Sequence, residues 1–529
     1  METHGGKILA EAIKTAYAQG FDDYHMKPIR IEGSEEGVIC DGDSVIFCCR
    51  RGEREIELTD FFVDRDFDKV ERRFLPDLHF VLLTQYHEKY RGLPIAFPPV
   101  KVDRPLSQVL SEAGKTQFHC AESEKFAHVT FFFNGGNNQG FAQETDVCVP
   151  SPKVDSFAQV PELSLDGVVQ KTLDALGRYD FLVVNFANGD VIGHTSSKDA
   201  KLEACRLISI HLQSVVRKAL SEDYVVAITA DHGNIEKLYA SDGRPDVAHT
   251  TNLVSFVLID PRNPCEPISL ASGGALKDVA PTVLAVMGLK KALQMTGESL
   301  VREKDWGEGR RMLLLILDGW GLGSGDDNDA IHLADTPYWD MLLKTQSWTK
   351  LEASGAFVGL GEGKPGNSEA GHMNLGAGRC VVQDDIRIDT AIEDGSFASN
   401  AVILKALREA KVKNRALHLL AYLTYKSSHG SLSYSLAVCE MAKKEGVANV
   451  YLHVILDGRS SEPGSAPVML EYLEKELEKI GIGKIVDVVG RGIALDRDQN
   501  YAKVKLAYDL MVEGKVGDSP DCNSSHTQK

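Results

Sequence analysis

Short apolar runs that each end in Gly, Asp, Asn or His constrain the fold of this chain more than any other feature. They are VTFFFNGG from Val129, DFLVVNFAN from Asp180, YVVAITADHG from Tyr224 and MLLLILDGWG from Met312. Such a run is typical of a buried strand in an α/β sheet, where ligands bind beyond the carboxyl ends. A stretch with helical spacing, KLEACRLISIHLQSVVRKAL from Lys201, lies between two of them. The sequence therefore predicts repeated strand-helix units.

The length of 529 residues favours two domains, or three, over a single core. Two segments resemble boundaries: the proline-rich run GLPIAFPPVKVDRP from Gly92 and the charged run REKDWGEGRR from Arg302. The polar tail from Gly517 is expected to be disordered. The first residues, 1–19, lack a long apolar core and predict a helix rather than a secretory signal.

Composition excludes several classes of partner. No apolar run approaches the roughly 20 residues that a membrane span needs, so we expect no membrane contact. The formal net charge of -18 argues against nucleic acid as a partner. The ten cysteines show no C-x-x-C pair, which suits a reducing compartment, and we expect a cytoplasmic protein. An anionic small substrate fits only if basic side chains gather locally.

Acidic and histidine residues cluster at or after the predicted strand ends. They are Asp190, His194, Asp231, His232, His249 and Asp318. Carboxylate and imidazole ligands together suit Mn²⁺ or Zn²⁺, whereas Mg²⁺ prefers oxygen alone. Two such ions about 3.5 to 4 Å apart can clamp a phosphoryl group. Taken singly, an Asp after a strand is more often a helix cap or a turn residue, and a lone His is more often an ordinary surface or core group. Their joint occurrence predicts a two-metal site for phosphoryl chemistry.

Ser368 is the candidate nucleophile. It stands in GKPGNSEAGHMNLGAGR from Gly363, where glycines let backbone approach a phosphate and a metal can lower the pKa of a hydroxyl. The alternative is that Ser368 or Asn367 only caps a helix that has Glu369 in its first turn.

Basic residues that could bind an anion are scattered along the chain, and each could instead be a solvated surface residue. The candidates are Arg51, Arg54, Lys125, Arg459, Arg491 and Arg497. The stretch AGKTQ around Lys115 lacks the spacing of a phosphate-binding P-loop, so we exclude that motif.

Taken together, the motifs LDGWG, GNSEAGHMNLGAGR, AESEKFAHVTFFFNGG, TADHGN and HTTN, with N-x-A-N-x-D-x-x-GHT, resemble one family. It is the cofactor-independent phosphoglycerate mutases, within the alkaline phosphatase superfamily. The resemblance implies an α/β chain of two domains, an alkaline-phosphatase-like metal-binding domain and a smaller α/β phosphotransferase domain. It also implies interconversion of 3-phosphoglycerate and 2-phosphoglycerate in glycolysis and gluconeogenesis, by a monomer that needs no 2,3-bisphosphoglycerate.

The resemblance also implies roles for individual residues. One metal, usually Mn²⁺ with Mg²⁺, Co²⁺ or Zn²⁺ as alternatives, would be held by Asp190, His194 and His249. The second would be held by Asp318, Ser368, Asp231 and His232. Ser368 would carry the phosphate as a phosphoserine intermediate, and His429 would act as general acid or base. The substrate-binding residues would be Arg51, Arg54, Lys125, His429, Arg459, Ser460, Arg491 and Arg497.

The order of the motifs departs from the family. Members begin with the LDGWG strand and end near an MTG-x-SL segment, whereas MTGESL here precedes REKDWGEGRR and LDGWG. The resemblance therefore implies a circular permutation. It places the metal-binding domain at 100–381 and builds the phosphotransferase domain from 1–99 and 382–529.

Local departures leave other functions open. The family's DGRD reads DGRS here, which puts Ser460 where a carboxylate is expected, and the loop before His429 is altered. The family's F-N-F-R reads C-C-R-R, which adds Arg50. The alternatives are a metal-dependent phosphatase or phosphopentose mutase of the same superfamily, and a catalytically silent binding protein.

Overall fold

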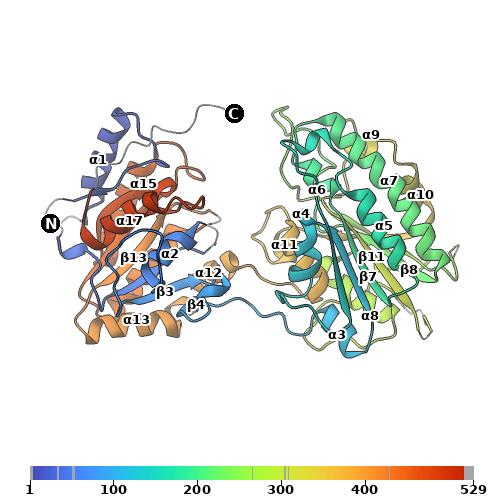
Figure 1. Cartoon of the computed structure of the whole chain (residues 1–529), viewed down its shortest axis with the longest axis horizontal. Coiled ribbons are helices and arrows are strands. Elements are labelled where there is room, and N and C mark those ends of the chain that lie inside the picture. The colour runs from blue at the N-terminus through green and yellow to red at the C-terminus, as the bar shows by residue number, and fades with distance from the viewer. Residues whose placement is uncertain are drawn as a thin grey trace. The chain divides into compact units, whose positions relative to one another are not determined.

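The computed structural model describes residues 4–31, 35–50, 54–264, 266–302, 305–307, 309–427 and 429–516. The chain divides into two compact units, each with its own sheet (Figure 1). Unit 1 comprises 1–99 and 384–529, and unit 2 comprises 100–383. The predicted α/β class is confirmed for both. None of the described helices is both long enough and apolar enough to span a membrane.

Unit 2 is built on an eight-stranded mixed sheet. In spatial order its strands are β10 (Gly274–Ala275), β12 (Ser347–Glu352), β9 (Val254–Ile259), β8 (Tyr224–Thr229), β11 (Arg311–Leu317), β7 (Phe181–Phe186), β5 (Gln117–Glu122) and β6 (Glu144–Val149). The strands from β8 to β6 in this order are parallel, and β9 is antiparallel to both neighbours. Nearly every residue of β7, β8 and β11 is buried, as expected for strands covered on both faces.

The register makes the central strands end together. Leu317 of β11 lies opposite Phe186 of β7, and Ile316 lies opposite Thr229 of β8. The segments that follow these strands therefore emerge at one edge of the sheet.

Helices cover both faces of this sheet (Figure 1). One group comprises α5 (Leu165–Ala175), α7 (Lys198–Ser221), α9 (Ala330–Leu333) and α10 (Pro337–Thr345). The other comprises α3 (Leu106–Glu112), α8 (Val279–Val286) and α11 (Ser368–Ala377). The short helices α4 (Ser123–Ala127) and α6 (Asn188–Gly193) follow β5 and β7. The helix predicted from Lys201 is confirmed as part of α7.

The prediction of a strand from Val129 is wrong. The chain continues from α4 into a helical segment, His128–Phe132, whose hydrogen bonds are of the wider π type. Val129 and Phe133 are fully buried while the residues between them are partly exposed. That spacing of four is helical, so the apolar run fills one helix face, and β5 supplies the strand just before it.

Unit 1 has a seven-stranded sheet that is parallel except at one edge. Its order is β1 (Ile29–Arg30), β15 (Lys484–Gly490), β14 (Val450–Leu456), β13 (Leu417–Leu423), β2 (Ser44–Phe47), β3 (His79–Thr84) and β4 (Ile95–Phe97). Strand β1 is the antiparallel one, and an apolar core lies on each face.

Two groups of helices cover the unit 1 sheet. One comprises α1 (Gly6–Ala18), α12 (Asp384–Glu393), α13 (Ala401–Val412), α14 (Leu432–Glu445) and α15 (Ala466–Ile480). The other comprises α2 (Glu55–Val63), α16 (Arg491–Ala494) and α17 (Tyr501–Glu513). The helix predicted at the start of the chain is confirmed as α1. The tail predicted to be disordered lies outside the described residues.

Candidate functional site

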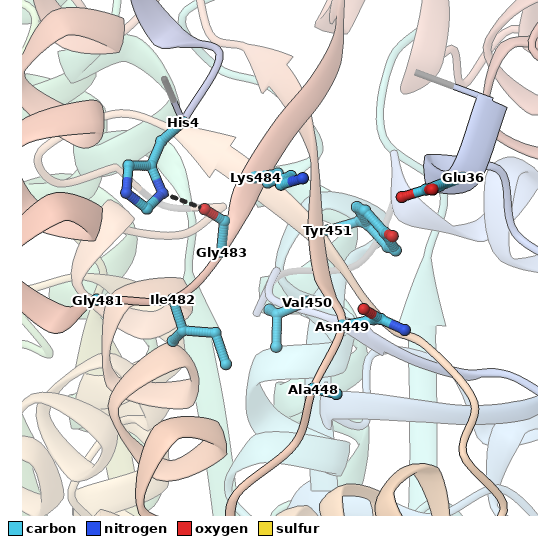
Figure 2. A pocket seen from close by; sticks show the side chains of 10 residues that line it. All are labelled: His4, Glu36, Ala448, Asn449, Val450, Tyr451, Gly481, Ile482, Gly483 and Lys484. Atoms are coloured by element: carbon cyan, nitrogen blue, oxygen red, sulfur yellow. Dashed lines mark hydrogen bonds between the residues drawn. The ribbon is translucent and has the colours of Figure 1, made fainter. Parts of the chain in front are cut away.

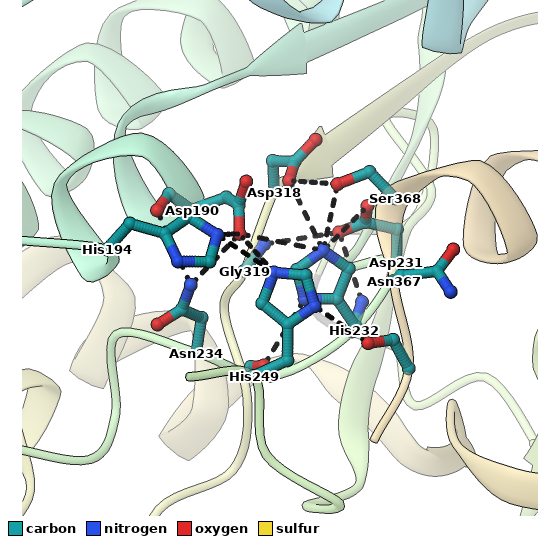
Figure 3. Close-up of polar contacts among 12 residues, drawn as sticks. Asp190, His194, Asp231, His232, Asn234, His249, Asp318, Gly319, Asn367 and Ser368 are labelled. Carbon is teal, nitrogen blue, oxygen red and sulfur yellow. Dashed lines mark hydrogen bonds and ion pairs between the residues drawn. The ribbon is translucent and has the colours of Figure 1, made fainter. Parts of the chain in front are cut away.

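Three buried carboxylates gather where the parallel strands of unit 2 end (Figure 3). Asp318 directly follows β11, Asp231 comes two residues after β8, and Asp190 lies on α6 just after β7. The matched register of these strands puts the three side chains close together, although up to 128 positions of sequence separate them. This is the edge where α/β sheets bind ligands.

The backbone around the carboxylates leaves no room for side chains at two glycines. Gly319 has a φ of 70°, and a Cβ there would lie 2.7 Å from the backbone nitrogen of Asp190. A Cβ on Gly371 would lie 2.6 Å from the carbonyl oxygen of Asp231. Glycine at these positions therefore lets the β11 turn and α11 close on the acidic cluster.

Ser368 stands at the amino end of α11, beside the carboxylates. Asn367 caps this helix, since its side chain accepts a hydrogen bond of 2.8 Å from the backbone N–H of Ala370. The helix-cap alternative therefore holds for Asn367, while Ser368 is the first residue of the helix and stays a candidate nucleophile. The Oγ of Ser368 lies 2.9 Å from Nε2 of His232 and donates a 3.2 Å hydrogen bond to Oδ1 of Asp318.

Lys125 joins the cluster from the α4 segment after β5. Its Nζ donates hydrogen bonds of 2.6 Å to Asp190, 2.8 Å to Asp318 and 2.6 Å to Oγ of Ser368. Only 5% of the residue is exposed. Lys125 is therefore a buried counter-charge for the carboxylates and touches the candidate nucleophile directly.

Three histidines approach the same carboxylates (Figure 3). Nε2 of His249 lies 3.0 Å from Oδ1 of Asp190, and Nε2 of His194 lies 3.3 Å from that atom. Nε2 of His232 lies 3.4 Å from Asp231 and 3.8 Å from Asp190. The structure thus brings together all seven residues that the resemblance implies as metal ligands, with His232 between the two groups.

Second contacts orient two of these rings. Nδ1 of His194 pairs with the carbonyl oxygen of Val247 at 2.8 Å, and Nδ1 of His249 pairs with that of Gly366 at 2.8 Å. A ring nitrogen held by a carbonyl leaves Nε2 as the ligand atom, which is the usual arrangement of a metal-binding histidine.

Sequence reasoning missed His372 and Asn185. Nδ1 of His372 lies 3.2 Å from Oδ2 of Asp231, and its Nε2 lies 3.0 Å from Nδ2 of Asn185, which also donates to Asp318 at 2.7 Å. His372 comes four residues after Ser368, on the same face of α11, and that spacing could have indicated it.

The buried charges of the cluster shift one another's pKa values. Burial alone would lower the pKa of Lys125, but Asp318 and Asp190 outweigh burial and raise it above its usual value. Burial raises the pKa of Asp318, and the charge of Asp231 raises it further. For Asp231, burial is outweighed by His232 and His372, which hold its pKa well below the usual range. One lysine among three buried carboxylates leaves a site that favours further positive charge.

The donor set fits divalent metal ions. Asp190, His232 and His249 each offer a ligand atom within 4.8 Å of the others, and so do Asp231, Asp318 and His372. Oδ2 of Asp231 is buried and accepts no hydrogen bond from the described residues, since Nδ1 of His372, although 3.2 Å away, pairs with the carbonyl oxygen of Ser368 at 2.9 Å. Carboxylate oxygens beside imidazole nitrogens suit a transition-metal ion such as Mn²⁺ or Zn²⁺.

The predicted residues of unit 1 also follow strand ends. His429 comes after β13, Arg459 and Ser460 after β14, and Arg491 directly after β15. Arg491 is 1% exposed and donates a 2.6 Å hydrogen bond to Oδ1 of Asp457, which also accepts one from the Tyr422 hydroxyl at 2.7 Å. Asp457 is thus a buried carboxylate that orients Arg491, and sequence reasoning missed it.

The remaining predicted residues differ in exposure. Arg54 is 8% exposed and donates to the carbonyl oxygen of Leu495 at 3.1 Å, whereas Arg459, Ser460 and Arg497 are exposed. Arg51 lies outside the described residues.

A separate cavity of about 370 Å³ lies at the opposite, amino edge of the unit 1 sheet (Figure 2). His4, Glu36, Tyr451 and Lys484 contribute polar atoms to its wall. It does not include the site residues predicted from the sequence.

Two family models match the chain. The Metalloenzyme superfamily model matches residues 27–291, and the model described as BPG-independent PGAM N-terminus matches residues 388–528. Curated relatives from Akkermansia muciniphila and Moorella thermoacetica are both named 2,3-bisphosphoglycerate-independent phosphoglycerate mutase. The first relative is 41% identical, and the match covers 55% of this chain and 56% of the relative. The second is also 41% identical, and the match covers 57% of this chain and 58% of the relative. The chain thus spans little more than half the length of the curated relatives it matches.

A solved structure of Leishmania mexicana phosphoglycerate mutase at low cobalt concentration has a TM-score of 0.40 and 27% identity. The match covers 50% of this chain and 52% of the chain in that structure.

The α/β fold and the buried cluster of carboxylates and imidazoles are characteristic of a metalloenzyme. The chain belongs to the Metalloenzyme superfamily, whose model matches half of it. The predicted resemblance to the phosphoglycerate mutases is confirmed by the second model and by the relatives.

Proposed function

We propose that this chain is a 2,3-bisphosphoglycerate-independent phosphoglycerate mutase that passes the phosphate through Ser368. The position of the Ser368 hydroxyl carries the proposal, since it contacts Lys125, His232 and Asp318 at a helix amino end. The names of the matched relatives supply the substrate.

The proposed site holds two divalent ions, with Mn²⁺ preferred and Mg²⁺, Co²⁺ or Zn²⁺ as alternatives. Asp190, His194 and His249 would hold one, and Asp231, His232, Asp318 and Ser368 the other. Such ions, when bound, lower the pKa of a coordinated hydroxyl and neutralise charge on a phosphoryl group.

Side chains of unit 2 carry out the transfer of the phosphoryl group. Oγ of Ser368 attacks the phosphorus of 3-phosphoglycerate, and the bond from phosphorus to the 3-oxygen breaks. Lys125 donates to Oγ and counters negative charge beside it, in a buried setting where such contacts are strong. The N–H groups at the start of α11 favour the dianion of a phosphoserine at Ser368. The glycerate 2-oxygen then attacks this phosphoserine and restores the serine.

The roles of the unit 1 residues are proposals that rest on the resemblance. His429 exchanges the proton of the glycerate oxygen, and the substrate is bound by Arg51, Arg54, Arg459, Ser460, Arg491 and Arg497, together with Lys125. We propose that an enzyme of this kind works as a monomer in cytoplasmic glycolysis and gluconeogenesis.

We also propose that the chain is a circular permutation of the family's usual order. The model named for the family's N-terminus matches 388–528, after the metalloenzyme match, and the LDGWG motif follows MTGESL. In this arrangement, unit 2 is the metal-binding domain and unit 1 the phosphotransferase domain.

Phosphorus NMR of the purified chain with Mn²⁺ and 3-phosphoglycerate, without 2,3-bisphosphoglycerate, tests the function. We expect a growing 2-phosphoglycerate signal that Ser368→Ala abolishes. Release of inorganic phosphate alone would show a phosphatase, and no turnover of any phosphate ester would show a silent binding protein.

A further inference from the structure

A buried carboxylate contacts the proposed general acid and base. Oε1 of Glu55, the first residue of α2, lies 2.8 Å from Nδ1 of His429, in the loop after β13. The two residues are 374 positions apart in sequence. Glu55 is fully buried, and the side chain of His429 is 14% exposed.

One carboxylate oxygen of Glu55 is unpaired. Its Oε2 is buried without a hydrogen-bond partner among the described residues, and so is Oε2 of Glu57 on the same helix. A buried charge with half of its acceptors unused costs stability. What distinguishes Glu55 from Glu57 is its ion pair with the His429 ring.

We propose that Glu55 is a positioning residue for His429, an inference that rests on the proposed function. The carboxylate accepts a hydrogen bond from Nδ1–H, which fixes the orientation and the tautomer of the ring. Since Nδ1 is committed to Glu55, proton exchange with the substrate falls to Nε2.

The proton balance closes over one turnover. His429 begins as imidazolium and gives its Nε2 proton to the 3-oxygen as the phosphorus–oxygen bond breaks. In the second half, Nε2 of the neutral ring takes the proton of the 2-hydroxyl as that oxygen attacks the phosphoserine. Ser368 enters and leaves the turnover as the same alkoxide, so its own proton does not enter the balance.

The chain supplies a matched control on the same helix. Glu57 is 5% exposed, lies two residues after Glu55 and accepts a 2.9 Å hydrogen bond from the backbone N–H of Gln499. Glu57→Gln therefore removes a buried carboxylate of α2 that has no recorded contact with His429.

The kinetic test compares Glu55→Gln, Glu55→Asp and Glu57→Gln as full chains with Mn²⁺. We expect Glu55→Gln to lower kcat about 10- to 100-fold, with KM changed less than about twofold, because positioned proton transfer contributes 10²- to 10⁴-fold. Glu55→Asp regains about tenfold of the lost kcat. Losses of similar size in Glu55→Gln and Glu57→Gln would overturn the proposal.

A second readout separates this inference from the proposed function. In ¹⁵N-histidine-labelled protein, the His429 ring signals are found by subtracting the spectrum of His429→Asn. We expect Nδ1 to be protonated in the wild type, and Glu55→Leu to return the ring to a tautomer mixture. This result supports the positioning role even if the wild type has no mutase activity, while a ring unaffected by Glu55→Leu overturns it.

Discussion

Replacing Lys125 by Met removes the positive charge from the acidic cluster but keeps an unbranched apolar stem. The ammonium makes three charge-assisted hydrogen bonds, and its loss leaves Asp190 and Asp318 buried without it. Removing one partner from a buried ion pair costs about 3 to 5 kcal/mol. We expect that loss of unfolding free energy in the metal-free protein.

Metal should offset most of this loss. Divalent ions bound by the same carboxylates supply the missing positive charge. The variant therefore binds them more tightly than the wild type, whose lysine already neutralises part of the cluster, and gains more stability from them. We therefore expect the cost of Lys125→Met to shrink to about 1 to 2 kcal/mol in Mn²⁺, the value of the lost hydrogen bond to Ser368.

Urea unfolding followed by tryptophan fluorescence measures this difference in EDTA and in Mn²⁺. The four tryptophans, at 306, 320, 339 and 348, all belong to unit 2, so the signal reports that unit. The control is Arg310→Met, which breaks a buried ion pair with Asp260 just before β11, at the other edge of the sheet. Its cost should be the same in both buffers. An equal cost of Lys125→Met with and without Mn²⁺ would show that metal does not replace the charge of Lys125.

Three further outcomes follow from the structure. Burial lowers the pKa of His418 to about 4, below the roughly 6.5 of a histidine in the unfolded chain. The contribution of the neutral ring to the free energy of unfolding is therefore complete above pH 6.5 and is lost as the pH falls through 4. Urea midpoints between pH 7 and 4 should fall less in His418→Gln, and an unchanged slope would contradict this. Gly319→Ala should abolish Mn²⁺ binding in calorimetry, because its Cβ would meet the backbone of Asp190. Asn367→Ala should cost about 1 kcal/mol of unfolding free energy through the lost helix cap, and a neutral result would show that the cap contributes nothing.

The acidic part of the site could be predicted because each carboxylate follows a strand that its own sequence reveals. The runs before Asp190, Asp231 and Asp318 are short and apolar, and parallel strands bring their carboxyl ends to one edge. The run from Val129 has the same composition, yet it is helical. Composition alone did not distinguish the two, whereas the burial spacing of Val129 and Phe133 does.

Contacts between distant segments could not be predicted from spacing. Lys125 was expected to bind substrate, but its contact with Ser368 spans 243 positions and arises only from the pairing of β5, β7 and β11. The same holds for Glu55 and His429, since nothing near either residue indicates the other. These contacts depend on tertiary structure, which a local pattern does not encode.

Mass spectrometry of the acid-quenched protein shows whether phosphate passes through Ser368. After incubation with Mn²⁺ and 3-phosphoglycerate, we expect a phosphorylated peptide with the modification on Ser368, which disappears in Ser368→Ala along with turnover. Turnover to 2-phosphoglycerate that persists in Ser368→Ala, with no phosphate on this serine in the wild type, would contradict this role of Ser368.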